Sequence, residues 1–281
     1  MTERPKTCDL HTHSNYSDGS LSPAELVALC ENAGLSAVAL TDHNTAKGLS
    51  EFMAAGEKST VETVAGCEFS TEFEGGEVHI AGLFLPPDTW DEVERYTMQL
   101  LIAKKRSNEA LIAALNKNGY DVTYDEAAAL TDADEFNRAH VARVLFDKGY
   151  VNSTKEAFDT LLKEEHGFYV PPKRPDALET VKFIKSCRAV AVLCHPFLNL
   201  SRERLPRFLS AAKSAGLDAM ETRYSDFDET ASREASNIAR EYGLKESGGS
   251  DFHGAAKPDI SPGTGRGPLC VPLEFYEALK G

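Results

Sequence analysis

The feature that most constrains the fold is an alternation of short apolar strands with helices, found on both sides of a purely helical stretch. In the first part of the chain the pattern predicts strands at 7–10, 37–40, 61–69 and 78–84. A helix is expected after Ser22, because Ser22, Pro23 and Glu25 supply a serine cap, a first-turn proline and an acidic residue three places after the cap. Such alternation is typical of a parallel α/β arrangement.

The alternation stops near Pro86 and Pro87 and resumes after Pro175. Between residues 90 and 172 apolar positions recur at helical spacing, as in Leu111, Ile112 and Leu115. The rest of the chain predicts helices at 176–186, 201–215 and 228–242 and strands at 189–194, 218–223 and 244–249. We therefore expect one α/β body made of residues 1–89 and 173–281, with a helical insert at 90–172.

Composition excludes several classes of protein. An apolar content of 42% and a charged content of 26% are ordinary for a globular chain. The net charge of −14 argues against a protein that holds nucleic acid through a broad basic surface. No apolar run approaches the ~20 residues that a bilayer requires, and the first residues lack the apolar stretch of a secretory signal. The 6 cysteines form no Cys-x-x-Cys pair and fit reduced thiols, so a cytoplasmic protein without membrane contact is expected.

Histidines and carboxylates stand at or near the ends of the predicted strands. The histidines in this position are His11, His13, His43, His79, His195 and His253, and the carboxylates are Asp18, Glu68 and Asp251. Catalytic groups of α/β barrels gather at the carboxyl ends of the strands. A His-x-His pair on an extended strand turns both rings to one face, and Asp251 and His253 repeat that spacing. Mixed imidazole and carboxylate ligands suit divalent transition metals, so the pattern predicts a metal site.

Each of these elements has a structural explanation as well. A lone His-x-His pair is common, Asp42 and His43 could form a simple turn, and His195 before Pro196 could be a packed core residue. Asp251 could only cap a turn. What favours the metal site is that all of these side chains occur together at strand ends.

Five segments resemble the PHP (polymerase and histidinol phosphatase) family. They are Asp9-Leu10-His11-Thr12-His13-Ser14, Thr41-Asp42-His43-Asn44, Gly66-Cys67-Glu68, Cys194-His195-Pro196 and Gly249-Ser250-Asp251-Phe252-His253-Gly254. The insert is similar to that of the TrpH-like branch, which resembles 3′,5′-nucleotide bisphosphate phosphatases. Residues 137–143, 149–151 and 169–171 carry that similarity. The resemblance implies an α/β fold, a distorted (β/α)7 barrel with an inserted small helical domain, and a site for two or three metals.

The family's ligands transfer to this chain position by position. The resemblance implies a first metal on His11, His13, Glu68 and Asp251, a second on Glu68, His79 and His195, and a third on Asp18, His43 and His253. The ions would be Mn²⁺, Fe²⁺ or Zn²⁺. The positive charge of three divalent ions would exceed the negative charge of the three carboxylates. The site would then be a positively charged pocket in an acidic molecule, suited to a phosphoryl dianion.

The insert is predicted to act as a substrate-specificity cap. Arg138 and His140 lie in its family-like motif, and arginine holds phosphate with two parallel hydrogen bonds. Lys104, Arg106 and Lys173 are further candidates, although a solvated surface charge is the simpler explanation for each. Tyr224, near the end of a predicted strand, is expected to line the pocket, with a packing role equally open.

Together these features predict a metal-dependent phosphoesterase. Its expected substrates are small phosphorylated nucleotides or sugar phosphates, as phosphomonoesters and also as cyclic phosphodiesters, attacked at phosphorus by a hydroxide that bridges two metals. One alternative is a 5′–3′ exonuclease on very short RNA, since the acidic surface disfavours long nucleic acid. An amidohydrolase with one or two metals and a non-catalytic accessory module are two others. Metal identity, the general acid and the oligomeric state stay open.

Overall fold

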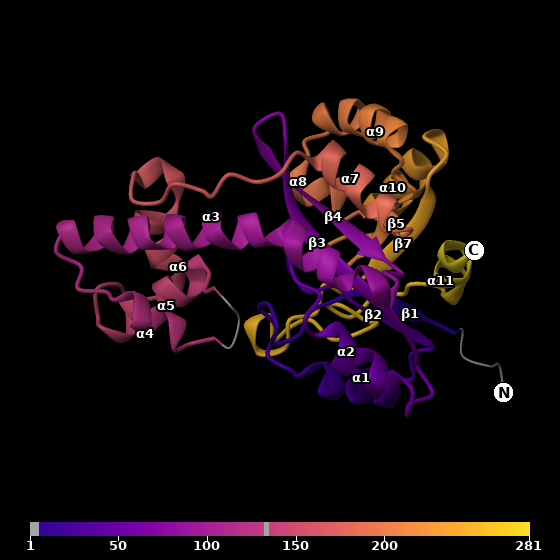
Figure 1. Ribbon diagram of the computed structural model, residues 1–281, viewed down its shortest axis with the longest axis horizontal. Helices are drawn as coiled ribbons and strands as arrows, with labels where there is room; N and C mark the ends of the chain where they lie inside the picture. The colour runs from indigo at the N-terminus through magenta and orange to yellow at the C-terminus, as the bar shows by residue number, and fades with distance from the viewer. Residues whose placement is uncertain (1–5, 132–134) are drawn as a thin grey trace. The chain divides into compact units, whose positions relative to one another are not determined.

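The computed structural model describes residues 6–131 and 135–281, in which seven strands form one sheet (Figure 1). The strands are β1 (Cys8–Thr12), β2 (Ala37–Leu40), β3 (Glu62–Phe73), β4 (Gly76–Leu83), β5 (Val190–Leu193), β6 (Ala219–Tyr224) and β7 (Lys245–Gly249). Their order in the sheet is their order in the chain, so each strand lies beside its neighbour in sequence.

The first and last strands meet and nearly close the sheet into a barrel. The backbone N–H of Asp251, just after β7, donates to the carbonyl of His11 at 2.9 Å, and the N–H of His13 donates to the carbonyl of Phe252 at 2.9 Å. The predicted seven-stranded α/β barrel is confirmed.

Strand β4 departs from the expected parallel arrangement. It runs antiparallel to both β3 and β5, whereas the other neighbouring pairs are parallel. Phe73 pairs with Gly76, and the two residues between them, Glu74 and Gly75, have φ angles of 47° and 74°. A two-residue link of this kind joins antiparallel strands, because a parallel pair needs a much longer crossover. The parallel arrangement that the alternation predicts therefore does not extend to β4.

Helices cover the outside of the barrel (Figure 1). They are α1 (Pro23–Asn32), α2 (Leu49–Gly56), α7 (Ala177–Ser186), α8 (Pro196–Asn199), α9 (Arg204–Ala215), α10 (Glu229–Glu241) and α11 (Leu273–Lys280). Helix α1 begins as predicted, with a reciprocal capping box between Ser22 and Glu25. Helices α1 and α2 pack together, α7 packs on β3, β4 and β5, and α10 packs on β6.

The chain divides into two compact units, Met1–Arg95 with Arg174–Gly281 and Tyr96–Lys173. The second unit holds most of α3 (Trp90–Lys117), then α4 (Tyr124–Ala128), α5 (Arg138–Asp147), α6 (Thr154–Ala157) and a π-helical turn, Phe158–Leu162. No strand occurs among its described residues. Its helices enclose an apolar core of their own, built around Leu111, Leu115, Val141, Leu145 and Leu162.

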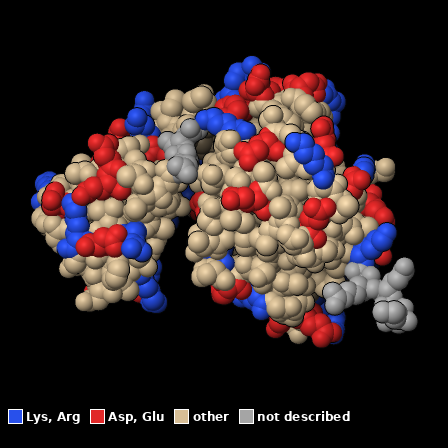
Figure 2. All heavy atoms as spheres, turned by 90° about the horizontal axis from the view of Figure 1, so that it is seen from below, with Lys and Arg blue, Asp and Glu red and all other residues tan. Residues whose placement is uncertain are grey.

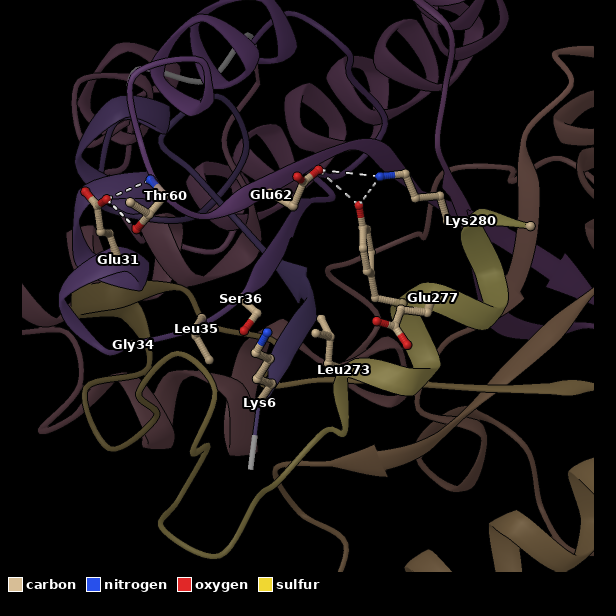
Figure 3. A pocket seen from close by; sticks show the side chains of 12 residues that line it. Lys6, Glu31, Gly34, Leu35, Ser36, Thr60, Glu62, Leu273, Glu277 and Lys280 are labelled. Carbon is tan, nitrogen blue, oxygen red and sulfur yellow. Dashed lines mark hydrogen bonds and ion pairs between the residues drawn. The ribbon is translucent and has the colours of Figure 1, made fainter. Parts of the chain in front are cut away.

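A polar pocket lies at the amino-terminal ends of β1, β2 and β3 (Figure 3). The Lys280 ammonium lies 2.7 Å from the Tyr276 hydroxyl and 3.5 Å from the Glu62 carboxylate, which ties α11 to β3. The histidines of interest follow the opposite ends of β1 and β2, so this pocket is not part of their site.

The 6 cysteines are free thiols, and only Cys270 among them is exposed. Within the described ranges, no helix has the length and apolar character needed to cross a membrane.

Gly249 provides the test of barrel closure. A Cβ placed on Gly249 would lie 2.5 Å from the backbone N and 2.8 Å from the Cα of His11. We expect Gly249→Ala to lower the free energy of unfolding by about 1–3 kcal/mol, because the closing strands must separate. Urea denaturation measures this loss. The control is Gly82→Ala on β4, where the added Cβ meets side chains alone, Ile184 at 3.3 Å and Phe69 at 3.5 Å. Equal stability of the two variants would contradict the close contact at the seam.

Candidate metal centre

Strand β1 turns two imidazoles into the barrel. Alternate residues of a strand share a face, and the Nε2 atoms of His11 and His13 lie 3.1 Å apart. Beneath them the buried Asp9 carboxylate accepts hydrogen bonds from the backbone N–H groups of Ser250 and Gly263, at 2.8 Å and 2.7 Å. Asp9 thus ties β1 to the segment after β7 and holds the two histidines at the mouth of the barrel.

Glu68 on β3 is the centre of the cluster. Its side chain is fully buried, and five imidazoles surround it. Oε2 lies 3.2 Å from His11 Nε2, 3.4 Å from His13 Nε2 and 3.1 Å from His43 Nδ1. Oε1 lies 2.9 Å from His79 Nδ1 and 3.0 Å from His195 Nε2. The two oxygens therefore face different sets of histidines.

His79 reaches Glu68 by a route that differs from the prediction. It lies in the first half of β4 and not at the strand's carboxyl end. Because β4 is antiparallel, this half lies at the same end of the barrel as the carboxyl ends of the parallel strands. Ser70 pairs with His79 and Glu68 pairs with Ala81, so Glu68 and His79 are diagonal neighbours on one face of the hairpin.

A second group forms around Asp18. The Asp18 carboxylate lies 3.2 Å from His253 Nε2 and 3.9 Å from both His43 Nε2 and His13 Nδ1. The rings of His13 and His253 stack with their centroids 4.1 Å apart. The loop after β1 and the segment after β7 thus meet at this edge of the cluster.

Asp251 completes the site, and its backbone conformation differs from the extended one that was predicted. Its φ angle of 55° is left-handed, so Asp251 and His253 do not form the extended pair that their spacing predicted. Oδ1 of Asp251 nevertheless faces His13 Nε2 at 3.2 Å. Oδ2 accepts from the Tyr224 hydroxyl at 2.9 Å and from the Lys257 ammonium at 2.6 Å. Tyr224 is buried and contacts the cluster through this hydrogen bond, and its predicted role in lining a substrate pocket stays a prediction.

Burial and opposed charges set the protonation of the cluster. Burial favours the neutral form of Glu68, but the charges of His43, His11 and His79 hold its pKa well below the usual value. Burial likewise opposes the charge on His79, but Glu68 raises its pKa to about 10. Burial and the neighbouring His253 and His43 lower the pKa of His13 to about 3. The same protein thus holds neutral and protonated imidazoles a few ångströms apart.

Unpartnered atoms in the cluster fit a bound cation. Among the described residues, His13 Nδ1, His43 Nδ1, His195 Nδ1 and Glu68 Oε2 are buried and form no hydrogen bond, although His43 Nδ1 and Glu68 Oε2 lie 3.1 Å apart. Ligand atoms of five sets also lie within 4.8 Å of one another: His13 with Asp18, His43 and His253; His11 with Glu68 and His195; His11 with His13 and Asp251; His43 with Glu68 and His79; and His11 with Cys194 and Glu221. Imidazole and carboxylate donors at such distances suit divalent transition metals. All nine residues predicted from the sequence lie in these sets.

Other charged residues support the cluster without having been predicted as part of the site. Glu221 on β6 accepts from His11 Nδ1, Glu77 lies 3.1 Å from His79 Nε2, and Lys257 pairs with Asp251. Arg174 in turn pairs with Glu77 at 2.9 Å. In the sequence, Glu77 lies two residues before His79, and this spacing could have indicated its role. Glu221 is not next to any of the histidine motifs, so nothing in the sequence indicated that it contacts the cluster.

Three of the basic residues predicted to bind substrate take part in local contacts within the insert. Arg138 donates to the carbonyl of Leu162 at 3.0 Å and lies 4.2 Å from the centre of the Tyr169 ring. His140 Nδ1 accepts from the backbone N–H of Asn137 at 3.1 Å in the cap of α5. Lys104 donates to the carbonyl of Glu135 at 3.0 Å. Arg106 and Lys173 are exposed. A substrate-binding role for these residues stays a prediction.

Comparison with known proteins identifies the relatives of this chain. The family model described as PHP domain matches residues 9–220. A 5′-3′ exoribonuclease from Haemophilus influenzae is 32% identical over 88% of this chain and 90% of its own length. A 3′,5′-nucleoside bisphosphate phosphatase from Chromobacterium violaceum is 28% identical over 94% of both chains. A phosphoribosyl 1,2-cyclic phosphate 1,2-diphosphodiesterase from Eggerthella lenta is 28% identical over 88% of this chain and 94% of its own length.

Two solved structures share the fold of this chain. A candidate metal-dependent phosphoesterase from Bifidobacterium adolescentis superposes with a TM-score of 0.84 at 25% identity, covering 98% of this chain and 96% of that one. A Chromobacterium violaceum protein described as an amidohydrolase, solved with bound sulfate and no metal, superposes with a TM-score of 0.81 at 26% identity and the same coverage.

The mixed protonation of the cluster predicts proton release on metal binding. Without metal, the pKa of His79 is about 10 and the pKa values of His11 and His253 are raised by Glu68 and Asp18 against the effect of burial. His79 and His11 therefore carry protons at about pH 7, and an imidazole must lose its proton to bind a metal. We expect Mn²⁺ binding to release protons and its affinity to increase with pH between about 6 and 8.

Calorimetric titration in buffers of different ionisation enthalpy measures this release. His79→Ala is expected to release fewer protons than the wild type. His166→Ala is the control, because His166 lies in the insert beside Glu165. A binding heat that is independent of the buffer would contradict the proposed protonation.

Proposed function

The chain belongs to the PHP domain family and is a hydrolase of phosphoric ester bonds, and we propose that it acts on small phosphorylated nucleotides or sugar phosphates. The observation that supports this most is the convergence of nine imidazole and carboxylate side chains, with unpartnered buried atoms, at one end of the barrel.

We propose that these side chains hold two or three divalent ions, Mn²⁺, Fe²⁺ or Zn²⁺. The first ion would take His11, His13, Glu68 and Asp251; the second Glu68, His79 and His195; the third Asp18, His43 and His253. Such ions, when bound, lower the pKa of water towards neutrality and neutralise the charge of phosphoryl oxygens.

The protein's own groups prepare the site for that chemistry. Glu68 presents one oxygen to the histidines of the first position and the other to those of the second, as a shared ligand requires. Tyr224 and Lys257 hold Oδ2 of Asp251, so that Oδ1 stays turned towards His13. His13, whose pKa is lowered to about 3 by burial and by His253 and His43, stays neutral and keeps a lone pair available.

Charge favours a small anionic substrate over a long one. The chain carries a net charge of −14, and on the face in Figure 2 basic and acidic side chains are interspersed. A long nucleic acid needs many phosphate contacts from Lys and Arg. A mononucleotide or sugar phosphate needs only the local positive field of the metal site.

The insert, residues 90–172, is proposed as a specificity cap that holds a second phosphate or the nucleoside through Arg138, His140, Lys104 and Arg106, together with Lys173 directly after it. Support comes from the bisphosphate phosphatase, whose similarity extends over 94% of this chain and so includes the insert. A 5′–3′ exoribonuclease acting on short RNA is the second candidate, favoured by the 32% identity to the Haemophilus influenzae enzyme.

A substrate panel tests the proposal and separates the candidates. We expect metal-loaded protein to release phosphate from 3′,5′-bisphosphonucleotides faster than from p-nitrophenyl phosphate. His13→Ala and Asp251→Ala should each abolish turnover, since each removes a ligand of the first metal. Faster release of mononucleotides from short 5′-phosphorylated RNA would select the exoribonuclease. Hydrolysis of N-acyl amino acids without any phosphatase activity would contradict the proposal in favour of an amidohydrolase.

Arg138→Ala tests the role of the insert. We expect KM to increase more for 3′,5′-bisphosphonucleotides than for p-nitrophenyl phosphate, because only the former carry a second phosphate. Steady-state kinetics on both substrates measure the difference, and thermal unfolding shows whether the loss of the contacts with Leu162 and Tyr169 destabilises the insert. Arg143→Ala is the control, since Arg143 is exposed and pairs only locally with Asp147. An equal change in KM on both substrates would argue against a phosphate-binding cap.

A further inference from the structure

Glu221 is a buried carboxylate that the proposed ligand set leaves out. It lies on β6 with 2% of its surface exposed. Its Oε1 accepts from His11 Nδ1 at 2.8 Å, and its Oε2 accepts from the backbone N–H of His195 at 2.6 Å. One side chain therefore touches a residue of the first proposed metal position and a residue of the second.

We propose that Glu221 is a positioning residue that holds His11 and His195 for the first two metals together. This inference rests on the metal centre proposed above. It makes Glu221 a support shared by two ion positions, although Glu221 itself binds neither ion.

The contact with His11 fixes which ring nitrogen is free. When Nδ1 carries the proton that it donates to Glu221, Nε2 keeps its lone pair. Nε2 is the atom that faces Glu68 Oε2 at 3.2 Å and Asp251 Oδ1 at 3.6 Å. A carboxylate behind a ligating imidazole orients the ring and increases its basicity.

The contact with His195 restrains a strained backbone. His195 has φ 25° and ψ 61°, a left-handed conformation that is costly for a residue with a Cβ. This conformation lets the chain leave β5 and begin α8 at once, with His195 Nε2 at 3.0 Å from Glu68 Oε1. Glu221 accepts the N–H of this residue and so fixes where its ring points.

Packing alone does not explain a charge at this place. A buried carboxylate costs free energy that an apolar side chain of similar volume would not. Both oxygens of Glu221 are directed at proposed ligand residues. Cys194 lies with His11 and Glu221 in one set of ligand atoms, and a further ion held by these three residues is the alternative that the test must exclude.

The test is metal affinity, measured on the whole chain without substrate. Mn²⁺ affinity and stoichiometry are obtained by chelator competition and elemental analysis for the wild type and Glu221→Gln. We expect two Mn²⁺ equivalents to bind about 10- to 100-fold more weakly in Glu221→Gln. The third equivalent, on Asp18, His43 and His253, should keep its affinity, and metal-free thermal unfolding should stay close to the wild type.

Glu246→Gln is the matched control, because Glu246 lies on the adjacent strand and pairs with Thr222 and Ser236 away from the cluster. Its affinities should equal those of the wild type. Glu221→Asp, which keeps the buried charge but shortens its reach, serves if Glu221→Gln fails to fold, and it should show the same selective weakening.

Three results would overturn the inference: unchanged affinities in a folded Glu221 variant, equal weakening of all equivalents, or loss of one whole equivalent in Cys194→Ser. A wild-type protein that binds no divalent ion would instead overturn the proposed function, so the two failures are distinguishable.

Discussion

The cluster depends on one electrostatic constraint, a fully buried Glu68 carboxylate with five imidazoles within 3.4 Å. A charge removed from water needs compensating charge and hydrogen bonds close by. Protons on His11 and His79 or divalent cations can supply that compensation, and they compete for the same nitrogen atoms. The surroundings of Glu68 therefore require positive charge, which either protonated imidazoles or divalent cations can provide.

The barrel supplies these side chains from distant parts of the sequence. The β3–β4 hairpin brings Glu68 and His79 together locally, whereas the seam between β1 and β7 brings His11 and His13 to Asp251 and His253. Supporting residues also lie on the strands of the barrel: Asp9 on β1, Glu221 on β6 and Glu77 on β4. The scaffold thus provides the proposed ligands and the groups that orient them.

Much of this arrangement was predictable from the sequence, because strand ends in an α/β barrel share one edge. This rule predicts from the sequence alone that nine side chains lie at one end of the barrel, before any contact between them is known. It did not predict the orientation of β4, because the two-residue turn at Glu74 and Gly75 makes this strand antiparallel, whereas the alternation with helices indicated parallel strands. It also gave no reason to select Glu221, which lies within a strand and reads as an ordinary strand residue. Lys257 was missed because its contact with Asp251 depends on a left-handed backbone at Asp251 that spacing does not reveal.

The seam between the first and last strands has a consequence for biosynthesis. Ser250 and Asp9, 241 positions apart, are joined by one hydrogen bond, and Asp251 and His253 follow directly after this point. A nascent chain leaving the ribosome exposes His11, His13, Asp18, His43, Glu68 and His79 long before Asp251 and His253 are translated. The early segment alone is an open, incomplete chelator. On the proposed ligand set, the full complement of ions can be bound only after the final strand has docked against β1.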